Sequence, residues 1–266
     1  MRILRPNPPP LVFDLVLLAL LATFAGFIDA IVGGGGLIQL PALFSVYPEA
    51  PPARLFGTNK LAAIAGTAVA ASRYLRRVRL PWRTLLPTMF TALIGSWLGA
   101  NVVSWLPREA VRPVMLLLLV VVAIYTFRRK RFGAEHAPRW RPAAEAWLGG
   151  ATGAVLGFYD GFFGPGTGAF LLFVFVRAFG WDLLVASTAA KVVNVATNTS
   201  ALLYFGATGN VMWRVGLLMA ACNIAGALLG TRLALSRGTG FVRQVFLIVL
   251  LLLIARFSWD TVAGWR

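Results

Sequence analysis

The sequence predicts an all-α protein: a polytopic transmembrane helical bundle of two tandem repeats, each broken at a glycine-rich motif. Three observations support this class: the composition, the length of the uncharged segments, and residues that recur at one fixed interval. Of the 266 residues, 59% are hydrophobic and only 13% are charged, whereas a soluble domain carries about 25% charged residues. The chain therefore has too few charged side chains to cover a surface in water.

The apolar residues are gathered in long segments with few or no charges. A helix needs about 20 apolar residues to cross the hydrocarbon core of a bilayer. Helices are favoured because lipid offers no partners to the backbone polar groups. Four segments have a suitable length: 11–32, 87–106, 111–127 and 241–257. The first is longer than the core of a secretory signal and recurs inside the chain, so we interpret it as a membrane helix.

The basic residues lie between the apolar segments, and they give a net charge of +16. One group is Arg73, Arg76, Arg77, Arg79 and Arg83, and another is 128–131 with Arg139 and Arg141. Such clusters are typical of cytoplasmic loops of membrane proteins. We therefore expect a lipid bilayer around the chain and no nucleic-acid partner.

The residues that build common catalytic and metal sites are scarce. Cys222 is the only cysteine and His136 the only histidine. A disulfide framework, a thiolate or zinc site and a Ser-His-Asp triad thus lack their components. The sequence predicts no enzyme, no cofactor and no bound metal. It also contains no Walker P-loop, so we expect an ion gradient rather than ATP to supply energy.

A repeat at an interval of 131 residues is the most informative feature. Residues 26–29 (Gly-Phe-Ile-Asp) match 157–160 (Gly-Phe-Tyr-Asp), and Lys60 matches Lys191. Further matches at this interval are Gly33 with Gly164, Gly35 with Gly166, Trp82 with Trp213, Arg83 with Arg214, Gly95 with Gly226, Gly99 with Gly230 and Arg112 with Arg243. Matches in rare residue types without a gap predict a duplication, with membrane repeats at 1–135 and 136–266.

Each repeat contains the same series of segments. These are a long apolar helix (11–32; 143–163), a short apolar stretch (36–47; 167–180), a small-residue helix (57–72; 186–205) and two fuller spans (83–106 and 111–127; 211–235 and 241–259). If the short stretches do not cross the membrane, the repeats are parallel. If each crosses or pairs with its neighbour, the repeats are inverted. Arg232, Arg237 and Arg243 favour the inverted arrangement, a recurring transporter plan.

The glycine breaks, 33–36 and 164–168, interrupt otherwise good helices. Small residues can serve close helix packing. Alternatively, the unwound backbone at Gly34, Gly35, Gly166 and Thr167 directs free amides and a helix N-terminus at a buried anion. Non-helical backbone at membrane depth requires protein or a water-filled cavity beside it, so the breaks predict a cavity.

Paired ionisable residues lie beside these breaks. Lys60 and Lys191 occur early in the small-residue helices, where each either binds an anion or extends to the headgroups. Asp29 and Asp160 precede the breaks by four residues, and within one half they could pair with the lysines or relay protons. Asn59, Asn194 and Asn198 add amide groups; Asn194 and Asn198 share a helix face with Lys191. These amides bind an oxyanion or join helices.

The doubled motif resembles the TauE/SafE family of sulfite-exporter-like permeases. The resemblance is carried by residues 26–35 and 157–168, followed by 57–60 and 189–194, and it covers essentially the whole chain. It implies a prokaryotic inner-membrane transporter of about eight spans. The implied substrates are sulfite, sulfoacetate and other small sulfur-containing or organic anions.

Taken together, the sequence predicts a multi-pass secondary transporter of small anions in a bacterial inner (plasma) membrane, working by alternating access. An anion channel or a structural membrane protein is the alternative. The sequence leaves the substrate, the direction of transport, the coupling ion and the oligomeric state open, including a homo-oligomer.

Overall fold

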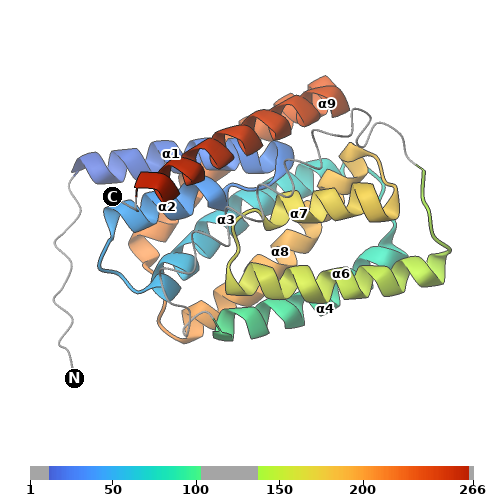
Figure 1. Cartoon of the computed structure of the whole chain (residues 1–266), viewed down its shortest axis with the longest axis horizontal. Coiled ribbons are helices and arrows are strands. Elements are labelled where there is room, and N and C mark those ends of the chain that lie inside the picture. The colour runs from blue at the N-terminus through green and yellow to red at the C-terminus, as the bar shows by residue number, and fades with distance from the viewer. Residues whose placement is uncertain (1–11, 103–136, 264–266) are drawn as a thin grey trace.

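The structure is a computed structural model that describes residues 12–102 and 137–263. Every regular element in these ranges is helical. The expected all-α class is therefore confirmed for the described residues (Figure 1). The predicted span at 111–127 and the predicted repeat boundary at 135/136 lie outside them.

The first part of the chain forms four helices. They are α1 (Val12–Val32), α2 (Gly36–Val46), α3 (Pro52–Leu75) and α4 (Trp82–Val102). The break between α1 and α2 uses Gly33 and Gly34, whose φ angles are +79° and +102°, a region that side chains with a Cβ rarely occupy. Helix α3 starts five residues earlier than predicted, because Pro52 is pre-organised for the first helical position.

The second described range, residues 137–263, has a similar order of long and short helices. It contains α6 (Pro142–Phe162), α7 (Thr167–Val174), the π-helical turn η2 (Phe175–Phe179), α8 (Leu183–Ala207) and α9 (Trp213–Ala263). Helix α8 also starts earlier than predicted, because the Asp182 carboxylate caps the amides of Leu184 and Val185. The two spans expected in 211–259 correspond to the two parts of α9, which meet at a kink at the non-helical residue Gly238.

Helices α1 and α2, like α6 and α7, form helical hairpins that turn at the glycine breaks. The two helices of each hairpin pack on each other. In the second hairpin, Trp181, just beyond η2, donates a 2.8 Å hydrogen bond from Nε1 to Glu145 at the start of α6. The chain therefore enters and leaves each hairpin at the same end, and the glycine break is its tip.

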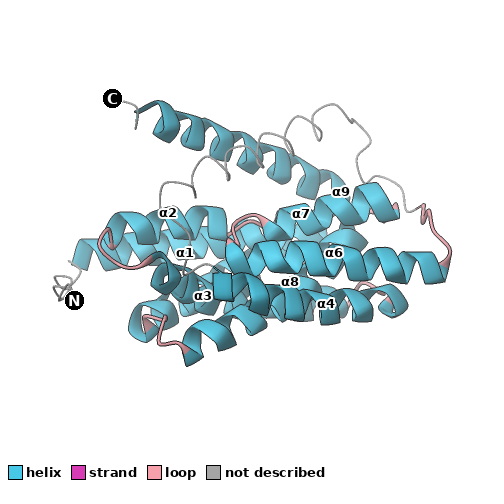
Figure 2. Ribbon diagram, turned by 60° about the horizontal axis from the view of Figure 1, so that its bottom comes forward, coloured by secondary structure: helices cyan, strands magenta, loops and turns pink. Residues whose placement is uncertain are grey.

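Glycines hold the longer helices in close contact. Helix α4 packs along α6, and α1 packs along α9, as Figures 1 and 2 show for α4 and α6. A Cβ at Gly157 would lie 2.5 Å from the carbonyl oxygen of Ala92, and one at Gly95 would lie 2.6 Å from that of Ala154. Close backbone approach through small residues is the packing expected of membrane helices.

The bundle has an apolar core, but it also exposes large apolar side chains and buries a set of polar ones. Large apolar side chains project outward from the outer helices, such as Phe13 (73% exposed), Phe90 and Trp147. Polar residues are instead buried on α3 and α8, including Thr67, Ser187 and Thr197. Within residues 12–102 and 137–263, three helices are long and apolar enough to cross a membrane: Val12–Val32, Trp82–Val102 and Trp213–Gly238. This distribution fits a protein surrounded by lipid with a polar centre.

Candidate functional site

The first hairpin tip is organised by Asp29. Its Oδ1 accepts hydrogen bonds from the backbone amides of Gly34 (3.0 Å) and Gly35 (3.1 Å), and its Oδ2 accepts one from the Thr67 hydroxyl at 2.8 Å. The amides of Gly34 and Gly35 are thus bound to a carboxylate of the same half. In this conformation the two amides are therefore not free, and their binding of an anion stays a prediction.

The second tip is held by other groups. The Tyr159 hydroxyl donates to the carbonyl of Pro165 at 2.8 Å, and the Thr167 hydroxyl donates to that of Gly164, also at 2.8 Å. The Thr167 amide donates to the same carbonyl at 3.3 Å. Among the described residues the Gly166 amide has no hydrogen-bond partner. The N-terminal end of α7 therefore retains a backbone donor, and its binding of an anion stays a prediction.

The two tips meet in the middle of the bundle. A Cβ on Gly33 would lie 2.6 Å from the carbonyl carbon of Gly168, and one on Gly168 would lie 3.0 Å from Cα of Gly33. Glycine is needed at both positions for this approach, and Gly33 also has a positive φ. The contact places the first turn of α7 directly beside the end of α1.

A buried ion pair links the two halves. Lys60 Nζ on α3 donates to Asp160 Oδ2 on α6 at 2.6 Å, and the side chains are 3% and 1% exposed. The pairing that the sequence analysis considered lay within one half, whereas the observed pair crosses between halves. Both hairpin tips lie beside α3: Asp160 accepts from Lys60, whereas Asp29 of the first hairpin accepts from Thr67, further along the same helix.

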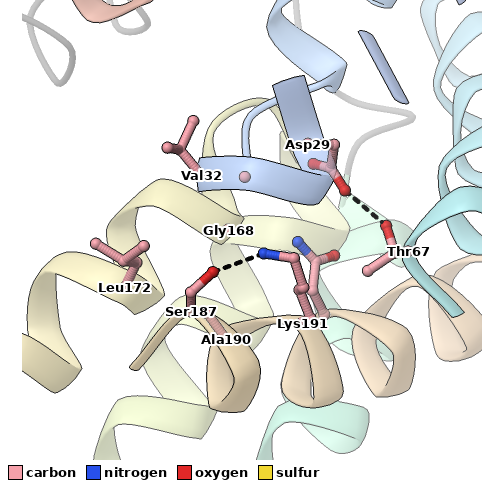
Figure 3. A pocket seen from close by; sticks show the side chains of 10 residues that line it. Asp29, Val32, Thr67, Gly168, Leu172, Ser187, Ala190 and Lys191 are labelled. Atoms are coloured by element: carbon pink, nitrogen blue, oxygen red, sulfur yellow. Dashed lines mark hydrogen bonds between the residues drawn. The ribbon is translucent and has the colours of Figure 1, made fainter. Parts of the chain in front are cut away.

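Lys191 on α8 is buried to the same degree, with 4% exposure, but in the described part of the chain it forms no ion pair. Its Nζ donates to Ser187 Oγ at 2.7 Å and lies 4.8 Å from the centroid of the Tyr74 ring. Figure 3 shows Lys191 and Asp29 lining one pocket. Both lysines point into the bundle, so the alternative that they extend to the headgroups is not what the structure shows.

The amide side chains continue this polar surface. Asn198 Nδ2 donates to Asn194 Oδ1 at 2.6 Å, so the two share hydrogen bonds along α8. Asn59 on α3 is 4% exposed, and its Oδ1 has no hydrogen-bond partner. Ser187, Lys191, Asn194 and Asn198 thus form a polar face along α8, since residues three or four apart are neighbours on a helix.

Two adjoining spaces lie at the meeting point of the tips. They share Asp29, Thr67, Gly168 and Asn194 in their walls. One of them is lined further by Lys60, Asp160, Asn59, Asn198, Gly34, Gly166 and Thr167, and Lys191 lines the other. The space lined by Lys60 has a volume of about 20 Å³, which is room for about one water molecule. The structure therefore brings ten of the eleven predicted site residues together at two small spaces; Gly35 lies beside them through its bond to Asp29.

Sequence reasoning missed several partners of these residues. Ser187 and Thr67 bind Lys191 and Asp29, and Tyr74 faces Lys191. Ser187 could have been found, because it lies four residues before Lys191 and therefore on the same helix face. The position of Tyr74 depends on how α3 packs against α8, which spacing does not reveal.

The fold and the polar centre define a multi-pass membrane protein with a buried, charged site between two hairpin tips. The described residues hold no cluster of three or more metal-ligating side chains. The model of the family described as "Sulfite exporter TauE/SafE" matches residues 18–257. The chain belongs to this family of membrane transporters.

Curated relatives support this assignment. The chain is 33% identical over 240 residues to "Probable membrane transporter protein YfcA" of Escherichia coli K12, covering 90% of this chain and 88% of the relative. It is 34% identical over 252 residues to "Probable membrane transporter protein ORF9" of Sinorhizobium sp, covering 94% and 95%. A "Probable membrane transporter protein" of Haemophilus influenzae is 33% identical over 241 residues, covering 91% and 92%. No solved structure matches the chain.

Proposed function

We propose that the chain is a secondary transporter of small anions, with sulfite, sulfonates and related oxyanions as its substrate class, in a bacterial inner membrane. The family description names a sulfite exporter, and the relatives given above are bacterial. The substrate binds between the two hairpin tips and reaches them from each side of the membrane in turn.

The observation that carries the proposal is the environment of Lys191. An ammonium group buried without a counter-charge in contact is costly, yet among the described residues the Lys191 ammonium contacts only a hydroxyl and an aromatic ring. The Gly168 backbone and the Asn194 amide line the same space. An oxyanion there would lie in direct contact with the ammonium group and accept hydrogen bonds from groups that are already in place.

Alternating access is supported by the relation between the halves. Helices α3 and α8 correspond at the 131-residue interval, and they run antiparallel: Gly57 near the start of α3 lies against Phe205 near the end of α8, while Tyr74 near the end of α3 lies against Lys191. The operation that places one half of the chain on the other therefore reverses the direction in which the equivalent helices run along the bundle. This favours the inverted arrangement over the parallel one, and two hairpins entering from opposite ends fit that plan.

The charges favour one orientation in the membrane. Arg76, Arg77 and Arg79 follow the end of α3, and Arg139 and Arg141 precede α6. Arg79 and Pro138 line one surface pocket, so the two basic segments lie at the same end of the bundle. By the positive-inside rule this end faces the cytoplasm. The first hairpin then enters from the outside and the second from the cytoplasm.

The observed conformation suits an occluded state, because the space between the tips holds only about one water molecule. An anion enters when one hairpin tip withdraws from the other. Withdrawal of the first tip opens the site to the outside, and withdrawal of the second opens it to the cytoplasm. The two tips thus act as alternate gates around one site.

Counterflow in proteoliposomes tests this function. Vesicles loaded with unlabelled sulfite, thiosulfate, sulfoacetate or methanesulfonate receive a trace of the same radiolabelled anion outside. The proposal predicts saturable, transient accumulation of at least one anion. Large unitary currents without counterflow would instead identify an anion channel, and neither signal from folded protein would refute the proposal.

A further inference from the structure

The ionisable groups of the site balance each other in number. The two spaces between the tips are lined by two carboxylates, Asp29 and Asp160, and two ammonium groups, Lys60 and Lys191. With all four ionised, their formal charges sum to zero. A bound monoanion would therefore leave one net negative charge in a buried region, where an uncompensated charge is strongly disfavoured.

The two carboxylates differ in how they are held. Asp29 receives three hydrogen bonds from its own half, from Gly34, Gly35 and Thr67. Among the described residues, the only side chain that donates a hydrogen bond to Asp160 is Lys60, its ion-pair partner. An anion that takes the Lys60 ammonium would thus strip Asp160 of this partner, whereas Asp29 would keep its three donors.

We propose that Asp160 takes up one proton when an anion displaces it from Lys60, so that anion and proton cross the membrane together. This inference rests on the proposed function and adds its coupling ion. The proton comes from water on the side to which the site is open and leaves on the other side, when the Lys60–Asp160 pair forms again. A monoanion carried in this way moves no net charge.

Other ionisable groups around Asp160 are few. Of the elements packed on α6, helix α8 contributes Lys191 to the adjoining space, whereas α4 and α7 contribute no charged side chain to either space. Lys60 on α3 is in contact, Asp29 on α1 faces the same space, and Tyr159 on α6 donates its hydroxyl to Pro165. Asp160 is therefore the acidic group whose partner an anion removes.

The same arithmetic disfavours exchange of an anion for a proton. In that mechanism the site releases its proton as the anion binds. The bound site then holds two carboxylates, the anion and two ammonium groups, which leaves one net negative charge. Uptake of the proton with the anion keeps the bound site neutral. It also leaves both lysines free to hold the substrate oxygens.

The experiment combines counterflow with proton flux. Proteoliposomes that contain a pH-sensitive dye receive sulfite, thiosulfate, sulfoacetate or methanesulfonate, and protein-free vesicles correct for passive entry of protonated sulfite. We expect the vesicle interior to gain about one proton per methanesulfonate taken up. This uptake should be driven by an alkaline interior and should not respond to a potassium diffusion potential. In Asp160→Asn we expect counterflow to persist at a measurable rate while the protons moved per anion fall about tenfold or more.

A matched control is available on the same helix. Glu145 is also a buried carboxylate of α6, hydrogen-bonded to Trp181 far from the tips, and Glu145→Gln should keep both counterflow and proton uptake. Counterflow without acidification in the wild type would overturn the inference and leave the proposed function standing. Equal proton uptake in Asp160→Asn would also overturn it. A lack of counterflow for all four anions would refute the proposed function and the inference with it.

Discussion

Replacement of Gly33 by alanine should separate the hairpin tips and impair transport. The new Cβ would lie 2.6, 2.8 and 2.9 Å from the carbonyl carbon and Cα of Gly168 and from the amide of Ala169. These are backbone atoms, so relief requires movement of a whole hairpin. The left-handed conformation at φ +79° costs about 1–2 kcal/mol for a residue with a Cβ, and overpacking adds about 1–3 kcal/mol.

Gly209→Ala is the matched control. Gly209 has nearly the same φ, +72°, but a Cβ there meets nothing within 4 Å, so only the backbone cost of about 1–2 kcal/mol applies. Unfolding by sodium dodecyl sulfate in mixed micelles should place Gly33→Ala below Gly209→Ala by about 1–3 kcal/mol. Counterflow should fall strongly only in Gly33→Ala. Equal stability and equal transport in the two variants would refute the packing of the tips described above.

Two further predictions concern the packing of charges and helices. Lys60→Met should lower the free energy of unfolding by about 3–5 kcal/mol, because it leaves Asp160 buried without its partner. The double variant Lys60→Met/Asp160→Leu should recover most of this loss. A double-mutant cycle in micelles that finds simple additivity would contradict the ion pair. Gly161→Ala should destabilise the protein, because the new Cβ would overlap the carbonyl of Ser96 on α4. Gly150→Ala on the same helix meets only a methyl group at 3.9 Å, so it should be neutral or stabilising by up to about 1 kcal/mol. Thermal unfolding that ranks the two variants in the opposite order would show that α4 and α6 do not pack as described.

Much of the fold could be predicted from residue type and spacing. The ends of α1, α2 and α6 fall within a residue of their expected positions, because glycine and proline mark them directly. The glycine breaks were also expected to lie beside a cavity. The charged and amide residues at the tips could be singled out because ionisable groups within apolar helices are costly and recur at symmetric positions.

The partners of these residues could not be predicted. Whether Lys60 meets Asp29 or Asp160 depends on how the two hairpins approach each other, and the sequence interval relates equivalent residues without giving their contacts. The same holds for the Gly34 and Gly35 amides. The sequence suggested that they bind an anion, and in the structure they donate hydrogen bonds to Asp29. Helix ends are local properties, whereas these pairings are made between elements far apart in the chain.

The most direct test of the central claim is equilibrium binding of an anion to the purified transporter. Radiolabelled sulfite and methanesulfonate are titrated onto the wild type, Lys191→Gln and Arg76→Gln, the last of which removes an exposed cation outside the site. The account predicts saturable binding to the wild type and to Arg76→Gln. Lys191→Gln should bind the anion about 10- to 150-fold more weakly, because it loses one charge-assisted hydrogen bond of about 1.5–3 kcal/mol. Equal affinity of all three proteins would contradict an anion site at Lys191.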